Sequence, residues 1–299
     1  MKNKLLRSLI GLPAEFKFLV GLSTVVILGQ ALFGAKIFLT LVAFFAASVA
    51  NATAIGGGFL FMPLFIFIYQ LAPPLALKLS IATQAFGMTS GALTWGRQYI
   101  DKNAFILASL ASVLGVWFAT YLWIVPSAYI KPLFALISLG VFIALVLEMR
   151  FKVSDQQQKV HFAPNAVSIL FVVSAFAGGL VTGWTAIGVG EVVALYLLFF
   201  YRLRLDVAIG TGVAVLAVSS IAGFVFHADL GGIPWELLIF TVPGVILGGR
   251  YGVKIAKYLE SSVSQSNSEQ RFKQSPLKTI FAAVILVDCM VILLSEFIF

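Results

Sequence analysis

The sequence predicts an all-α polytopic membrane protein with two inverted repeats, short or broken helices at two glycine motifs, and about 9–11 membrane segments. Hydrophobic residues make up 61% of the 299 residues and charged residues 11%, whereas roughly a quarter of a soluble domain is charged. Charge-free stretches at 103–130, 165–190 and 207–226 are each long enough to cross a bilayer as a helix. A glycine phrase occurs twice in apolar sequence, at Ala54–Gly58 and Ala186–Gly190.

Apolar runs between charges and Pro or Gly breaks give the expected spans in order. They lie near 16–33, 36–52, 59–71, 75–95, 104–124, 131–149, 165–183, 188–201, 206–227, 235–258 and 277–298. The run at 16–33 follows basic residues, as in a signal peptide. We interpret it as a retained span because Glu15 and Lys17 adjoin it and no small-residue cleavage site precedes soluble sequence. Segments 59–71 and 188–201 would rise only about 20 Å, which predicts half-helices.

The segments divide into two comparable halves. Residues 1–35 form an extra N-terminal span, 36–149 the first transmembrane repeat, 150–164 a cytoplasmic linker and 165–299 the second repeat. Each half contains an odd number of segments, so the two halves are expected to have opposite orientations. Beyond the glycine phrase, Ile81–Thr83 matches Ile209–Thr211.

The distribution of Lys and Arg predicts the orientation. With a cytoplasmic N-terminus, the basic clusters near 97–102, 150–159, 202–204 and 254–278 all fall inside. A re-entrant geometry for both short segments would expose two of these clusters outside and is disfavoured, although whether 59–71 and 188–201 fully span stays open. The layout fits a multi-pass protein of a cell membrane, here a bacterial inner membrane. It also explains the net charge of +8 without a nucleic-acid partner.

Few residues are available for catalysis or cofactor binding. The single cysteine, Cys289, excludes an internal disulfide, and His161 and His227 lie too far apart to suggest a bis-histidine haem. His227 has only Asp229 as a neighbouring partner, and no phosphate-binding Gly-x-x-x-x-Gly-Lys-Ser/Thr motif occurs. We therefore expect no enzyme activity, no cofactor and no metal.

The glycine phrases are the candidate substrate site. Helix N-termini carry unsatisfied N–H groups and about half a positive charge, so two half-helices meeting near the midplane would attract an anion. Nearby hydroxyl and amide side chains can bond oxyanion oxygens, or can instead cap their own helices, while the glycines can instead serve close packing. The candidate substrate-binding residues are Asn51, Thr53, Gly56, Gly57, Gly58, Thr83, Thr185, Gly188, Gly190 and Thr211.

Two stripes of small and polar residues run along the expected helices that follow the half-helices. One contains Thr83, Gly87, Ser90 and Thr94, and the other contains Gly212, Ser219, Gly223 and His227. Such stripes are typical of close helix packing, with a pore lining as the alternative. Trp95, Trp123, Trp184 and Trp235 fall near predicted helix ends, where aromatic belts are expected, and Trp184 is also a gate candidate.

Glu191 and Asp288 are the acids most clearly placed inside apolar segments. A carboxylate in a membrane costs about 2.5–3.5 kcal/mol on insertion scales. The positive end of the helix dipole at Gly190 offsets about 0.3–1 kcal/mol of this cost for Glu191, or up to about 2 kcal/mol when the group is partly buried. Since this does not cover the full cost, we expect protonation or a cationic partner. Both acids are candidate proton-coupling groups. The alternatives are helix capping for Glu191 and an interior hydrogen bond for Asp288.

The residues 54–63 (Ala-Ile-Gly-Gly-Gly-Phe-Leu-Phe-Met-Pro), their echo at 186–195 and the small-residue helices around Thr83 and Thr211 resemble the sulfite exporter TauE/SafE family of membrane permeases. The likeness covers roughly residues 36–298. It implies transport of sulfite, sulfoacetate, related sulfonates or organic acids, coupled to protons. The sequence departs from the family pattern at Glu191–Ala194, where an apolar run ending in proline is the norm.

Together these observations predict a secondary transporter of small anions that is coupled to protons. Its expected partners are a small anionic substrate, protons and the lipid bilayer, with the oligomeric state left open. A channel-like pore for an anion or neutral solute is one alternative, which proton-driven counterflow would distinguish. A non-transporting membrane assembly subunit is the other.

Overall fold

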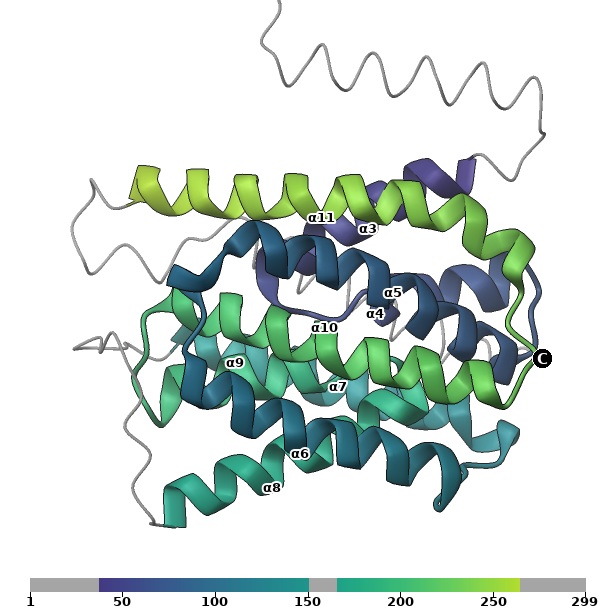
Figure 1. Ribbon diagram of the computed structural model, residues 1–299, viewed down its shortest axis with the longest axis horizontal. Coiled ribbons are helices and arrows are strands. Elements are labelled where there is room, and N and C mark those ends of the chain that lie inside the picture. Colours follow the sequence, from purple (N-terminus) through teal and green to yellow (C-terminus); the bar gives the residue numbers. More distant parts are fainter. Residues whose placement is uncertain (1–37, 151–165, 264–299) are drawn as a thin grey trace, which may run out of the picture.

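In the described part of the chain, helices occupy most of the apolar sequence, and Pro, Gly or charged residues lie at several of their ends. The computed structural model describes residues 38–150 and 166–263, and no β-strand occurs among them (Figure 1). The expected spans 16–33 and 277–298, together with Asp288, lie outside the described residues.

The first half contains α3 (Phe38–Thr53), α4 (Gly58–Pro63), the π-helical segment η2 (Leu64–Ile68), α5 (Pro73–Trp95), the 3₁₀ turn η3 (Arg97–Tyr99), α6 (Lys102–Tyr121) and α7 (Ser127–Arg150). The second half contains α8 (Ala166–Thr185), α9 (Val189–Phe199), α10 (Leu205–Asp229) and α11 (Trp235–Val263).

Local sequence explains several helix ends. Pro73 stands at the start of α5, where a missing N–H costs nothing, and Gly96 ends that helix with a φ of 80° that favours glycine. Asp101 caps α6, its carboxylate accepting a hydrogen bond from the Ala104 N–H at 2.9 Å. Pro63 coincides with the change from α-helix to π-helix between α4 and η2.

Four described helices are long and apolar enough to cross a membrane: α6, α8, α10 and residues 235–258 of α11. The predicted short segments are confirmed, because Gly58–Ile68 and Val189–Phe199 are short apolar helices. The expected span at 75–95 coincides with α5, which has 23 residues but is not among the helices marked by hydropathy. The number of membrane crossings stays a prediction.

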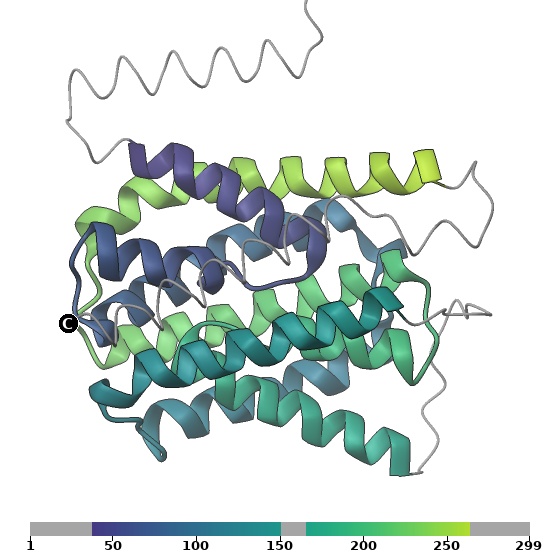
Figure 2. The ribbon, with the colours of Figure 1, turned by 180° about the vertical axis from the view of Figure 1, so that it is seen from behind.

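The helices are stacked in layers around a central pair. Helix α3 packs along α11, α8 packs along α6, and α5 and α10 contact each other between these two pairs (Figures 1 and 2). Glycines allow the outer pairs to approach closely, since a Cβ atom on Gly248 would collide with the Phe44 carbonyl and one on Gly179 would collide with the Ser112 carbonyl.

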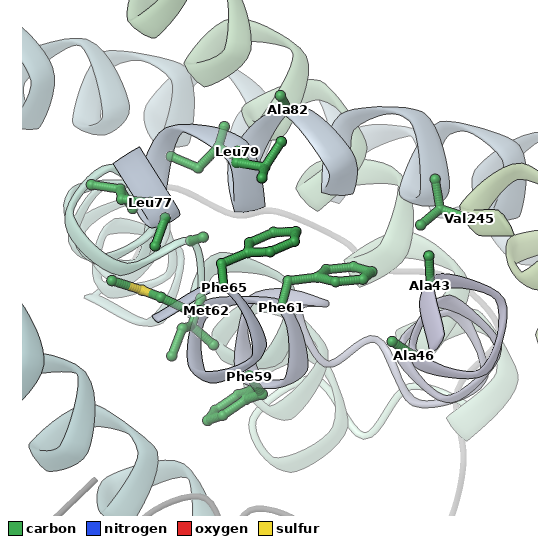
Figure 3. Packing of buried hydrophobic residues seen from close by; sticks show 14 of the residues in the cluster. Ala43, Ala46, Phe59, Phe61, Met62, Phe65, Leu77, Leu79, Ala82 and Val245 are labelled. Atoms are coloured by element: carbon green, nitrogen blue, oxygen red, sulfur yellow. The ribbon is translucent and has the colours of Figure 1, made fainter. Parts of the chain in front are cut away.

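The first half-helix is held in a hydrophobic core between α5 and α7. Figure 3 shows Phe61 and Phe65 pointing from α4 and η2 toward α5, with their rings stacked at a centroid distance of 6.0 Å. Phe59 points to the other side, where its ring packs edge-on against Phe134 of α7 at 6.1 Å. This packing fixes the direction in which α4 begins.

The two halves share backbone landmarks that are 132 residues apart. Ala54 and Ala186 both adopt left-handed backbone, with φ of 62° and 61°, and Gln70 and Arg202 do so as well, with φ of 52° and 49°. The residues that precede α5 and α10, Ala72 and Arg204, have nearly equal backbone angles.

This spacing changes one detail of the sequence comparison. In the backbone register Thr83 corresponds to Val215, so the match of Ile81–Thr83 with Ile209–Thr211 is displaced by one helical turn. The reason is that small and polar residues recur every three or four positions along both helices.

Candidate functional site

The two glycine phrases meet inside the protein. Each begins with a left-handed alanine that turns the chain back. The Ala186 carbonyl lies against Gly58, and the Ala54 carbonyl lies against Gly190, where a Cβ atom would be only 2.6 Å from the oxygen. Close approach of backbone to backbone therefore requires glycine at both positions.

Glu191 joins the two phrases. Its side chain lies in the first turn of α9 and is 3% exposed. Carboxylate Oε1 accepts a hydrogen bond from the Gly56 N–H at 2.5 Å, and Oε2 accepts one from the Gly188 N–H at 3.1 Å. The second bond is the returning half of a capping box, while the first connects residues 135 positions apart.

The Glu191 carboxylate is stabilised by backbone dipoles. Sequence reasoning required protonation or a cationic partner, and no cationic side chain bonds this carboxylate within the described residues. Two N–H groups directed at the carboxylate form strong charge-assisted bonds. The corresponding position in the first half is Phe59, so only one half carries the acid.

Gln84 is a site residue that sequence analysis missed. It lies on α5 and is 1% exposed. Its Oε1 accepts a hydrogen bond from the Gly58 N–H at 3.1 Å, and its Nε2 donates to Ser220 Oγ of α10 at 2.8 Å. A glutamine is costly to bury unless both ends of its amide are bonded, but the neighbouring polar residues Lys78, Ser80 and Thr83 obscure this signal in the sequence.

Backbone groups of the second glycine phrase are bonded by a residue of the same half. Thr182 Oγ1 lies 3.0 Å from the Ile187 carbonyl and accepts a hydrogen bond from the Val189 N–H at 3.1 Å. The position matching Thr182 in the first half is Ala50, which has no hydroxyl. The N–H groups of Gly56 and Gly58 are instead bonded by side chains from other helices, Glu191 and Gln84.

Other predicted site residues bond their own helices. Asn51 Nδ2 donates to the Ala47 carbonyl at 2.9 Å, and the hydroxyls of Thr53 and Thr185 donate to Val49 and Val181 at 2.9 and 2.8 Å. A Cβ atom on Gly57 would meet the Phe61 ring at 2.8 Å, so this glycine serves local packing.

Thr83 and Thr211 contact two different neighbouring segments. Thr83 Oγ1 lies 2.9 Å from Thr241 Oγ1 of α11, and Thr211 Oγ1 accepts a hydrogen bond from the Asp101 N–H at 2.9 Å. Within the stripes that contain them, Ser90 donates to the Ile246 carbonyl and Ser219 bonds Ser112 of α6. In the structure both stripes therefore make contacts between helices.

The tryptophans differ in their surroundings. Trp123 and Trp235 are more than half exposed. Trp95 is 1% exposed and donates its indole N–H to the Asn51 carbonyl, so it packs between helices. Lys257 covers its ring, with Nζ 5.4 Å from the centroid. Trp184 donates to the Trp123 carbonyl at 2.8 Å.

The region where the two glycine phrases meet contains backbone N–H groups that can donate hydrogen bonds to the oxygens of an anion. Three backbone N–H groups, of Gly56, Gly58 and Gly188, point at side-chain oxygens. No cluster of three His, Cys, Asp or Glu side chains able to hold a metal ion occurs in the described part of the chain.

Comparison with known proteins gives consistent matches. The sequence model of one family, described as "Sulfite exporter TauE/SafE", matches residues 39–287. The chain is 22% identical to the probable membrane transporter protein YjnA of Bacillus subtilis, over 83% of this chain and 96% of that protein. It is 24% identical to a probable membrane transporter protein of Methanocaldococcus jannaschii, over 81% of this chain and 88% of that protein. No solved structure shows a significant match.

Proposed function

Because this chain belongs to the sulfite exporter TauE/SafE family, we propose that it is a secondary transporter of small anions coupled to protons. Its relatives are named as probable membrane transporters, and the chain is a membrane transporter with several apolar helices. We further propose sulfite, sulfonates and related sulfur-containing or organic acids as the substrate class.

The observation that carries this proposal is the bridging of the two glycine phrases by a carboxylate. The N–H groups of Gly56 and Gly188 converge on the two oxygens of Glu191. Sulfite and sulfonates likewise present several oxygens that only accept hydrogen bonds. Backbone N–H groups are well suited to such anions because they carry a fixed partial positive charge at no cost of desolvating a cation.

Glu191 is the proposed proton-coupling residue. It is buried in the first turn of α9, and its hydrogen bonds reach both halves. A carboxylate in this position changes charge without exposing a new surface. Its protonation can therefore alter the electrostatics of the centre during a transport cycle.

We also propose that the two halves are inverted repeats in a bacterial inner membrane, with the N-terminus in the cytoplasm. The exchanged packing supports this arrangement, since the first helix of each half packs against the fourth helix of the other: α3 against α11 and α8 against α6. The equal left-handed alanines in the two phrases support it as well.

Transport by the purified protein tests the proposal. Proteoliposomes that contain the purified protein are placed in a solution of sulfite or a sulfonate, and flux into them is measured with and without an imposed proton gradient. We expect gradient-driven accumulation for the wild type and loss of the pH dependence in Glu191→Gln. The matched control is Asp229→Asn, an exposed acid at the end of α10, which should behave as wild type. Flux that dissipates gradients without accumulation would instead indicate a channel.

A further inference from the structure

Building on the proposed function, we propose that the Glu191 carboxylate is an internal competitor of the transported anion. It holds the N–H groups that the anion uses and releases them when it is protonated. Each anion therefore enters together with a proton taken up by the protein, and at neutral pH the empty transporter is closed by its own carboxylate.

Both oxygens of Glu191 already accept hydrogen bonds from the backbone donors of the proposed anion site. The Gly56 N–H is bonded at 2.5 Å by one oxygen, and the Gly188 N–H at 3.1 Å by the other. Gly56 lies in the turn before α4, and its N–H has no helical carbonyl as an alternative partner. A charged acceptor is thus already in place, and a second anion cannot share the same donors without like-charge repulsion.

Within the part of the chain that the structure describes, no cationic side chain is bonded to Glu191. The described helices α3, α4 and α8 and the segment η2 contain no ionisable side chain. On α10, Asp206 is paired with Arg204 in the first turn, and His227 and Asp229 lie in the last turn. On α5 the ionisable residue is Lys78, which donates to the Gly231 carbonyl at 2.6 Å. Since none of the described residues supplies a cationic partner, we assign the removal of the charge to a proton.

Gln84 limits the rearrangement that release of Glu191 requires. A Cβ atom on Gly56 would lie 3.1 Å from Gln84 Oε1 and 3.5 Å from Glu191 Oε1, so both side chains border the same turn. The Gln84 amide is bonded to Gly58 on one side and to Ser220 on the other. It stays in place when Glu191 moves, so the exchange between carboxylate and anion is local.

Anion-dependent thermal unfolding of the purified full chain tests this inference. The probes are methanesulfonate, which remains ionised throughout the pH range, and formate, which matches the missing carboxylate. In Glu191→Ala we expect a saturable rise in Tm with either anion at neutral pH and no dependence of this rise on pH. In the wild type the rise should be absent at neutral pH and develop as the pH falls. Asp229→Asn should follow the wild type.

The outcomes separate this inference from the proposed function. A folded Glu191→Ala protein whose Tm responds to neither anion overturns the competition, even if the wild type transports sulfonates. If that variant does not fold, the wild type decides, and the absence of stabilisation by methanesulfonate at low pH overturns the inference. Anion-stabilised Glu191→Ala protein combined with no flux in the wild type would contradict the transport proposal alone.

Discussion

At the scale of single residues, Gln84 connects the start of α4 with α10 through both ends of its amide. Gln84→Met leaves the Gly58 N–H and the Ser220 hydroxyl without this partner. We expect a loss of about 1–3 kcal/mol in the free energy of unfolding, the usual cost of a buried polar group left unpaired. Reversible unfolding in mixed micelles measures it.

A double-mutant cycle supplies the control for this prediction. Ser220→Ala should cost less in the Gln84→Met background than in the wild type, with a coupling energy of about 0.5–3 kcal/mol. Strictly additive effects of the two substitutions would show that the hydrogen bond between these side chains contributes nothing to stability.

Gly58 provides a second test at this scale. Gly58→Ala places a methyl group against the Ala186 backbone, which belongs to the opposite phrase and cannot move independently. We expect a clear fall in Tm and loss of flux. Gly140→Ala is the matched control, because a Cβ atom on Gly140 of α7 would meet nothing within 4 Å. This substitution only removes the cost of glycine in a helix, which is about 0.5–1 kcal/mol. Equal behaviour of the two variants would contradict the contact between the phrases.

Sequence reasoning singled out Glu191 and the two glycine phrases, which lie together in the structure, but it did not single out Gln84 or Ser220. Glu191 could be identified from sequence because a carboxylate within an apolar segment costs free energy in any orientation of the side chain. Gln84 and Ser220 could not be identified in this way, because the same residue types occur at ordinary helix contacts, as Ser112 and Ser219 do here. Burial and partner identity, which only the fold provides, separate the two cases.

At the scale of elements, the contact between α6 and α10 can be tested by cross-linking. Ser112 Oγ and Ser219 Oγ lie 2.7 Å apart. In a Cys289→Ser background, the pair Ser112→Cys with Ser219→Cys should form a disulfide under mild oxidation, detected by a mobility shift on non-reducing gels. The pair Ser112→Cys with Thr241→Cys joins the outer layers and should remain reduced. A shift in the second pair would contradict the layered packing.

Helix positions were largely predictable because apolar runs and breakers carry the information. The two half-helices were predictable because the apolar sequence between each glycine phrase and the next charge or proline is too short to cross a bilayer as a helix. The residue-by-residue alignment of the two halves was not predictable from sequence. Thr83 and Thr211 match in sequence but lie at different distances from the starts of their helices. The small-residue pattern repeats with every turn, so sequence alone cannot distinguish displacements of one turn.

At the scale of the whole molecule, the charge distribution predicts which end faces the cytoplasm. Gln98, in the turn between α5 and α6, and Leu230, in the turn between α10 and α11, are both exposed. In a Cys289→Ser background, a membrane-impermeant maleimide should label Leu230→Cys in intact bacteria and Gln98→Cys only after permeabilisation. The reverse pattern would place the N-terminus outside.

The character of α5 has a consequence for how the protein is made. This helix is long but less hydrophobic than the four membrane-length helices, and its most extensive contacts are with α10 and α11. During synthesis α5 leaves the ribosome before either of these helices exists. Because α5 is less hydrophobic than α6, α8 or α10, we expect its insertion to depend more on packing against the second half. Nascent chains truncated before α10 are therefore expected to be poorly integrated and rapidly degraded, although they contain the complete first half.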